Sequence, residues 1–196
     1  VIADLMPQAL PAFRAAGHNA RVRFLDLAAN AVSEAVAGGE ADFGICSMHS
    51  LDPGLRFEAL CEDRLVLVSH IDHPRAVEDR ACLTDLAGVD LILPARGTGN
   101  RVLIDDMLAR MESTLRWTFE TERSTTALSL VSGGVGVALL PLSLMRSCND
   151  DRVVWRPLLA PEIARPVGLL SRIGSKDNAH VAGLKAAIRD AASARA

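Results

Sequence analysis

The sequence predicts an α/β fold built as two similar lobes. Apolar runs of strand length alternate with segments in which apolar residues recur at helical spacing, a pattern typical of this class. The alternation occurs twice along the chain, with a boundary near residues 69–74. Because strands separated by helices usually need crossover connections, we expect mostly parallel strands.

The first half of the chain is expected to form two helices and several strands. Pro7 and Pro11 limit where regular hydrogen bonding of the first helix can begin, which makes this helix a candidate for a kink. Gly38 and Gly39 would close the second helix, and the apolar run 65–68 is typical of a strand buried on both faces. The expected elements are a helix over 5–16, a strand over 21–25, a helix over 29–37, a strand over 42–46, a turn over 52–54 and one or two strands within 57–69.

The second half repeats this pattern. Gly133 and Gly134 would end one helix, and Pro141 would stop the strand that follows it. The alanine-rich stretch near the C-terminus strongly favours a helix. The expected elements are a strand over 91–93, a loop over 96–100, a helix over 101–111, a strand over 117–122, a helix over 125–131, strands over 137–140, 153–158 and 166–171, and a helix over 178–194.

Composition excludes several classes of function. The 196 residues carry a formal net charge of -3 without any block of lysine or arginine, so this chain is not expected to bind DNA by itself. No uninterrupted apolar run reaches the roughly 18 residues that span a bilayer, so we expect no membrane contact. Four cysteines lack a Cys-x-x-Cys pair and histidines at zinc spacing, which indicates reduced, mostly buried thiols in a cytoplasmic protein.

Three segments carry a resemblance to a known family. Val36–Ile45 contains Gly-Glu-x-Asp at the end of a predicted helix and the strand that follows. Phe57–Pro74 is similar to a strand that crosses from one lobe to the other and closes with His73 and Pro74. Leu130–Pro141 contains a helix, a Gly-x-Gly turn and a strand ending in Leu-Pro. In this order and spacing, the segments resemble the effector-binding domain of LysR-type transcriptional regulators over nearly the whole chain.

The resemblance implies a fold like that of type II periplasmic binding proteins. Two Rossmann-like lobes would be joined by two crossover strands, with a ligand cleft between them. Lobe I would comprise residues 1–69 and 168–196, and lobe II residues 70–167. The family's N-terminal winged helix-turn-helix domain is absent from this chain. The strand with which such domains open, and the serine or threonine before their first helix, are also absent, because the first predicted helix begins almost at Val1.

The resemblance also implies a function. The domain would sense a small, anionic effector between its lobes and transmit binding as a rearrangement of lobes and subunits. It would form a homodimer, and a tetramer in the full-length protein, and it would reach DNA through the missing N-terminal domain. We expect neither cofactor nor catalysis, since no nucleophile and base stand in a recognisable motif.

Two alternatives share the two-lobed scaffold. A periplasmic solute-binding protein of a transporter is one, although four unpaired cysteines count against export. An enzyme such as a deaminase or a transferase is the other. Fold alone excludes neither.

Helix N-termini at the carboxyl ends of strands indicate where an anion would bind. The unpaired N–H groups there carry about half a positive charge, and the helices near Ala29, Asn100 and Thr125 all follow predicted strands. Ala29 stands where family members often carry a hydroxyl side chain. Arg101 is the charge that would pair with a carboxylate. The predicted effector-binding residues are Ala29, Ser47, Met48, Thr98, Asn100, Arg101, Thr125 and Val135.

Each of these residues also has an ordinary structural interpretation. Asn100 and Thr125 are typical helix N-caps, and Arg101 could be a solvated helix residue. His49 could line the pocket or lie on a surface loop.

Metal and nucleotide sites are poorly supported. The pair of histidines in His70–His73 lacks a third convergent ligand. Gly97–Gly99 and Gly134–Gly136 each begin like a dinucleotide fingerprint, but Val102 and Leu139 replace its third glycine.

Overall fold

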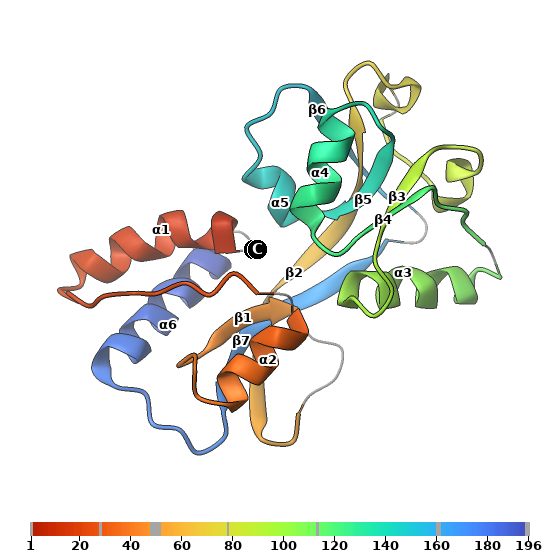
Figure 1. Cartoon of the computed structure of the whole chain (residues 1–196). Coiled ribbons are helices and arrows are strands. Elements are labelled where there is room, and N and C mark those ends of the chain that lie inside the picture. Colours follow the sequence, from red (N-terminus) through yellow and green to blue (C-terminus); the bar gives the residue numbers. More distant parts are fainter. Residues whose placement is uncertain are drawn as a thin grey trace. The chain divides into compact units, whose positions relative to one another are not determined.

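A computed structural model describes residues 2–27, 29–47, 52–77, 79–112, 114–159 and 162–194. The chain divides into two compact units (Figure 1): unit 1 is formed by Val1–Glu62 and Pro166–Ala196, and unit 2 by Asp63–Arg165. The division expected from the sequence, at residues 69–70 and 167–168, falls inside the same two strands, β2 (Leu55–His70) and β7 (Ala164–Arg172).

Unit 1 combines both ends of the chain. In its part of the sheet, β7 lies between β1 and β2, and β1 pairs with β7 in the antiparallel direction. Two of its helices, α1 and α6, lie side by side (Figure 1) and share a core that includes Leu5, Phe13, Leu169 and Ile188. Besides the segments of β2 and β7, its elements are α1 (Ile2–Ala15), α2 (Ala29–Ala37), β1 (Gly44–Ser47) and α6 (Ala179–Ser193).

Unit 2 is built around a sheet with the strand order β6-β2-β5-β3-β4. Alternate residues of its strands enter two separate cores: Leu67 and Leu139 face one, and Val68 and Ala138 face the other. Both faces of this sheet are therefore buried. Its further elements are β3 (Leu91–Pro94), α3 (Gly99–Arg110), β4 (Phe119–Thr121), α4 (Ser124–Ser132), β5 (Val137–Pro141), α5 (Leu142–Arg146), β6 (Val153–Pro157) and short 3₁₀ turns at Pro74–Val77 and Leu83–Leu86.

The expectation of mostly parallel strands is wrong for the pairings whose register is described. β3 runs parallel to β4 and β5, whereas β2 is antiparallel to β5 and β6, and β1 is antiparallel to β7. The exceptions all involve β2 or β7, the two strands that pass from one unit to the other. An alternating helix and strand pattern does not distinguish such a crossing strand from an ordinary one.

The predicted strand over 21–25 is also wrong. This segment is irregular, and within the described part of the chain the backbone of residues 19–25 makes no hydrogen bond. Its alternating composition suits a strand, but strand structure requires a neighbouring strand that accepts and donates hydrogen bonds.

The cysteine prediction needs one correction. All four cysteines are free thiols, but only Cys46 is buried, and the other three are half-buried. Burial raises the pKa of Cys46 to about 11. Among the described residues, no helix combines the length and apolarity needed to cross a membrane.

The Gly-x-Gly turn before β5 yields a testable prediction. A Cβ atom at Gly136 would collide with the backbone carbonyl of Asp90, whose oxygen accepts a hydrogen bond from Val137 N at 2.9 Å. Since backbone must move to make room, Gly136→Ala should lower the free energy of unfolding by about 1–3 kcal/mol, as overpacking typically does. Urea denaturation measures this change.

Gly133, in the same turn, provides the matched control. Its φ of -81° suits alanine, and a Cβ there would stand at ordinary contact distance, 3.5 Å from two carbonyl oxygens. Gly133→Ala should therefore change stability by less than about 1 kcal/mol. If Gly133→Ala and Gly136→Ala lowered the free energy of unfolding equally, the close approach of the Asp90 carbonyl to Gly136 would not explain the loss.

Candidate functional site

A small cavity with both polar and apolar lining lies in unit 2 where the parallel strands β3 and β4 end. Its volume is about 30 Å³, and the N-terminal residues of α3 and α4 both contribute to its wall. Carboxyl ends of parallel strands are where open α/β sheets usually receive ligands. The lining residues are Ile92, Pro94, Thr98, Asn100, Thr121, Glu122, Ser124, Ala127, Leu139 and Leu140.

Thr98 is the N-cap of α3. Its backbone is extended, its Oγ1 accepts a hydrogen bond from Arg101 N at 3.4 Å, and it donates to Ala95 O at 2.7 Å. The interpretation of Asn100 and Thr125 as N-caps is therefore wrong. Asn100 is the second residue of α3, and Arg123, which makes no side-chain capping hydrogen bond, precedes α4. Each predicted cap lies two residues after the actual N-cap position, because several hydroxyl and amide residues follow one another at both helix starts.

Asn100 belongs to a buried polar network. Its Oδ1 accepts a hydrogen bond from Arg165 Nη1 at 2.7 Å, and Arg165 Nη2 forms an ion pair with Asp63 Oδ2 at 2.7 Å. Asp63 also accepts hydrogen bonds from the backbone N and the Oγ of Ser143, at 3.0 and 2.7 Å. The network thus fixes the orientation of the Asn100 amide and presents its NH₂ group away from Arg165.

Arg101 is not a solvated helix residue, contrary to one of its two sequence interpretations. Its side chain is 3% exposed, and its guanidinium contacts Asp105 Oδ1 at 2.9 Å and Glu120 Oε1 at 2.6 Å. It also donates to Pro94 O at 3.1 Å and lies 4.2 Å from the centre of the Trp117 ring. Burial alone would lower the pKa of Arg101, but the hydrogen bonds with the two carboxylates outweigh burial and raise it. The guanidinium therefore forms its hydrogen bonds and ion pairs with residues of unit 2.

The other predicted residues are spread over both units. In unit 1, Ala29 is the first residue of α2, and Ser47 is the last residue of β1 and half-buried. In unit 2, Thr125 is exposed on α4 and Val135 is exposed in the turn before β5. Met48 lies outside the described residues, as does His49. Of the predicted set, the cavity brings together Thr98 and Asn100.

The sequence reasoning missed three polar residues of this cavity. Thr121 is the last residue of β4, Glu122 follows it, and Ser124 begins α4. The sequence did contain a signal for these residues. They follow the end of a parallel strand, and the carboxyl ends of parallel strands lie at one edge of the sheet, which is the reasoning that led to Thr98.

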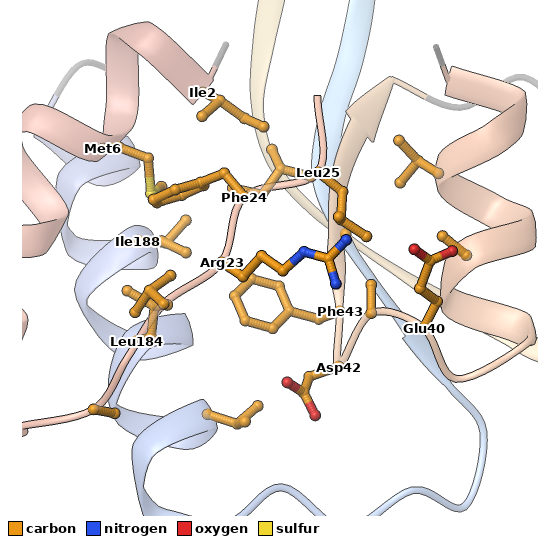
Figure 2. Close-up of a pocket in the computed structure, with 18 of the residues that line it drawn as sticks. Ile2, Met6, Arg23, Phe24, Leu25, Glu40, Asp42, Phe43, Leu184 and Ile188 are labelled. Carbon is orange, nitrogen blue, oxygen red and sulfur yellow. The ribbon is translucent and has the colours of Figure 1, made fainter. Parts of the chain in front are cut away.

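A second cavity, of about 270 Å³, lies within unit 1 and is mainly apolar. In Figure 2, Met6 of α1 and Leu184 and Ile188 of α6 form one side, while Leu25 and Phe43 stand on the other. The segment 20–25 lies along this cavity, so the residues expected to form a strand line an apolar space instead.

Metal binding finds no support in the described ranges. They contain no group of three or more histidine, cysteine or acidic side chains placed to hold an ion. His70 Nδ1 lies 3.6 Å from Asp72 Oδ2, and His73 Nδ1 accepts a hydrogen bond from Arg75 N.

Comparison with known families gives a match over nearly the whole chain. Residues 1–193 match the family described as the LysR substrate binding domain. The chain is 31% identical over 167 residues to the uncharacterized HTH-type transcriptional regulator YbhD of Escherichia coli, covering 85% of this chain and 53% of that protein. It is 26% identical to the HTH-type transcriptional regulator BenM of Acinetobacter baylyi, covering 86% of this chain and 56% of BenM. The chain thus spans about half the length of these curated relatives.

Solved structures of effector-binding domains share the fold. The effector-binding domain of QuiR in complex with shikimate superposes with a TM-score of 0.83 at 22% identity, covering 96% of this chain and 90% of that one. The effector-binding domain of BenM with benzoate gives a TM-score of 0.82 at 23% identity, covering 99% of this chain and 88% of that one. These likenesses confirm the α/β fold of the type II periplasmic-binding-protein kind that the resemblance implied.

Proposed function

The chain belongs to the LysR substrate-binding domain family, and from this premise we propose that it senses a small, anionic effector within a longer, cytoplasmic transcription regulator. The family consists of regulators and not of enzymes. DNA binding would reside in sequence outside this chain, as the names and lengths of the HTH-type relatives suggest. Self-association as a dimer or tetramer would carry the signal from this domain to the DNA-binding domains.

The regulator is favoured over the solute-binding protein of a transporter. The curated relatives are HTH-type regulators, and the structural neighbours include effector-binding domains with benzoate and with shikimate. Both of those small molecules carry a carboxylate, which supports an anionic effector for this chain as well.

The observation that carries the proposed site is that the N-termini of α3 and α4 both line one small cavity. The N–H groups of the first turns of α3 and α4 add partial positive charge there. In the described part of the chain, the Asn100 amide nitrogen and the Ser124 hydroxyl have no recorded hydrogen-bond partner. They are therefore the donors that we propose for the effector carboxylate; a cavity of about 30 Å³ holds little more than that group, so the rest of the effector would lie outside it.

Glu122 narrows the chemistry of the proposed effector. Glu122 is exposed and lines the same cavity as these donors, so a second anionic group on the effector would be repelled. A hydroxyl or an amino group on the effector would instead donate to Glu122. We therefore favour a hydroxy or amino monocarboxylate over a dicarboxylate.

A thermal-shift screen of monocarboxylates, with and without hydroxyl or amino groups, tests the proposed function. A ligand at about 100 times its dissociation constant should add roughly 2.7 kcal/mol of stability. For the ligand so found, Asn100→Ala and Ser124→Ala should each weaken binding tenfold or more in calorimetry. Ser129→Ala, which removes an exposed hydroxyl of α4 outside the cavity, is the control and should leave affinity unchanged.

Unchanged affinity in both cavity variants would overturn this site. The other predicted contacts, Ala29, Ser47, Met48, Thr125 and Val135, stay predictions for the same ligand. Ser47→Ala tests the contact from unit 1 and should also weaken binding.

A further inference from the structure

One guanidinium group joins the cavity of unit 2 proposed for the effector to both strands that leave this unit. Arg165 lies on β7, and its ion-pair partner Asp63 lies on β2. Asp63 and Arg165 are the first and the last residue of unit 2, so they lie where each strand crosses into unit 1. The second partner of Arg165 is Asn100, which lies in the first turn of α3 and lines the cavity. One side chain therefore contacts the cavity wall and both crossing strands.

Arg165 holds its two partners through different nitrogen atoms. Nη2 and Nε lie 2.7 and 3.3 Å from Asp63 Oδ2, and Nη1 donates to Asn100 Oδ1 at 2.7 Å. The Arg165 and Asp63 side chains are almost fully buried, which strengthens these hydrogen bonds. A guanidinium is planar and fixes the directions of its N–H groups relative to one another, whereas a lysine ammonium is a single charged nitrogen. The position of the Asn100 amide is therefore tied to that of Asp63.

The chemistry of Arg165 determines which way the Asn100 amide faces. A guanidinium has N–H donors and no acceptor, so the amide oxygen and not the NH₂ group must face Arg165. The NH₂ group then faces away from Arg165, and it is the donor proposed above for the effector carboxylate. If the amide turned over, its oxygen would face the carboxylate and repel it. The orientation that Arg165 imposes is therefore the one that suits an anionic effector.

We infer that Arg165 is a positioning residue for the effector, which orients the Asn100 amide and transmits the occupancy of the cavity to β2 and β7. This inference rests on the effector site proposed above. An effector carboxylate that accepts from the Asn100 NH₂ group polarises the amide and strengthens the hydrogen bond that its oxygen accepts from Arg165. Because the same guanidinium binds Asp63, the change reaches both strands at the boundary of unit 2.

Amide signals in nitrogen–proton NMR spectra test the positioning role without any effector. Arg165→Lys keeps a cation beside Asp63 but cannot reproduce both contacts, so it should shift the side-chain NH₂ signals of Asn100. Arg64→Lys is the matched control, because Arg64 is the neighbour of Asp63 on β2 and its side chain is exposed. It should leave the Asn100 signals in place. Unchanged Asn100 signals in a folded Arg165→Lys protein would overturn the inference.

Asn100→Ala keeps the test valid where Arg165→Lys fails to fold, because it leaves the buried ion pair of Arg165 in place. This variant should shift the side-chain Nε–H signal of Arg165. It should also shift the backbone signals of Cys61 and Val167, which lie on β2 and β7 within unit 1. If all three signals stayed where they are in the parent protein, the cavity and the two strands would not be coupled and the inference would be wrong.

Titration with sodium acetate, against sodium chloride at equal ionic strength, tests the coupling to the effector. Acetate is the carboxylate probe because a cavity of about 30 Å³ holds little more than that group. In the parent protein, acetate should cause saturable shifts at Asn100 and Ser124 and smaller ones at Cys61 and Val167. Arg165→Lys should weaken acetate binding about tenfold, as expected for one hydrogen bond to a charged group, and should abolish the shifts on β2 and β7 at saturation.

The outcomes separate this inference from the proposed function. An acetate titration without shifts at Asn100 and Ser124 would overturn the effector site, while the Asn100 signals of Arg165→Lys still decide whether Arg165 positions that amide. Shifts at Asn100 and Ser124 with equal affinity in the parent protein and in Arg165→Lys would overturn the inference and leave the effector site in place. Arg64→Lys should bind acetate as the parent protein does.

Discussion

Replacing Asp63 by alanine is expected to lower the free energy of unfolding by about 3–5 kcal/mol, the cost of removing one partner from a buried ion pair. The Asp63 side chain is 5% exposed, and that of its partner Arg165 is 11% exposed. Without Asp63, the Arg165 guanidinium loses its carboxylate, and the backbone N and hydroxyl of Ser143 lose their acceptor. Asn100 also loses the fixed position of its own donor.

Urea denaturation followed by circular dichroism measures this change, and Glu162→Ala supplies the control. Glu162 pairs with Arg64, the residue next to Asp63, at 2.6 Å, but the two side chains are 59% and 48% exposed. A surface pair contributes about 0–1 kcal/mol, so Glu162→Ala should have little effect. Losses of similar size in the two variants would show that burial does not set the strength of the Asp63 network.

Arg101→Ala is expected to cost about 2–4 kcal/mol of stability. Removal of this buried cation leaves its two carboxylate partners without an ion pair. Glu120 and Asp105 are 35% and 54% exposed, however, and their carboxylates can be hydrated instead. The loss of stability is therefore smaller than that for a fully buried ion pair. The cation–π contact with Trp117 contributes about 0.5–1 kcal/mol of this loss. Tryptophan fluorescence should report the change around Trp117 directly.

Arg110→Ala, on the same helix, is the matched control. Arg110 pairs with Asp106 across one helical turn at 2.8 Å, with both side chains more than half exposed. This pair contributes a few tenths of a kcal/mol, so the control should remain as stable as the parent. An Arg101→Ala protein of unchanged stability and tenfold weaker effector binding would contradict the internal role of Arg101 and restore it as an effector contact.

Local patterns in the sequence predicted most of the elements correctly. The bounds of α2 are those expected from its periodicity and its closing glycines, and Asn178 caps α6 through its side chain as the predicted helix start implied. The short helix α5 (Leu142–Arg146) was missed because the proline before it suggested only the end of a strand. The predicted strand over 21–25 failed for the opposite reason, since its composition is suitable but its backbone has no partner in the described chain.

The candidate site was predictable in position more than in detail. The rule that ligands meet the carboxyl ends of parallel strands led to Thr98 and Asn100, which do line one cavity. The partners of Arg101 could not be foreseen, because Glu120 lies nineteen residues away along the chain, on a neighbouring strand. Likewise, Asn100 meets Arg165 across 65 residues of sequence. Such contacts depend on the finished sheet, which local spacing does not encode.

The division of the chain into one continuous unit and one formed by both ends has a consequence for biosynthesis. Residues 63–165 emerge from the ribosome as an uninterrupted stretch and include every strand of the unit 2 sheet, so unit 2 can fold while translation continues. Unit 1 cannot, because the core between Leu5 and Ile188 requires α6, which is translated after unit 2. The apolar face of α1 must therefore stay exposed until unit 2 and α6 have been synthesised. Chaperones should therefore act on α1 more than on any element of unit 2.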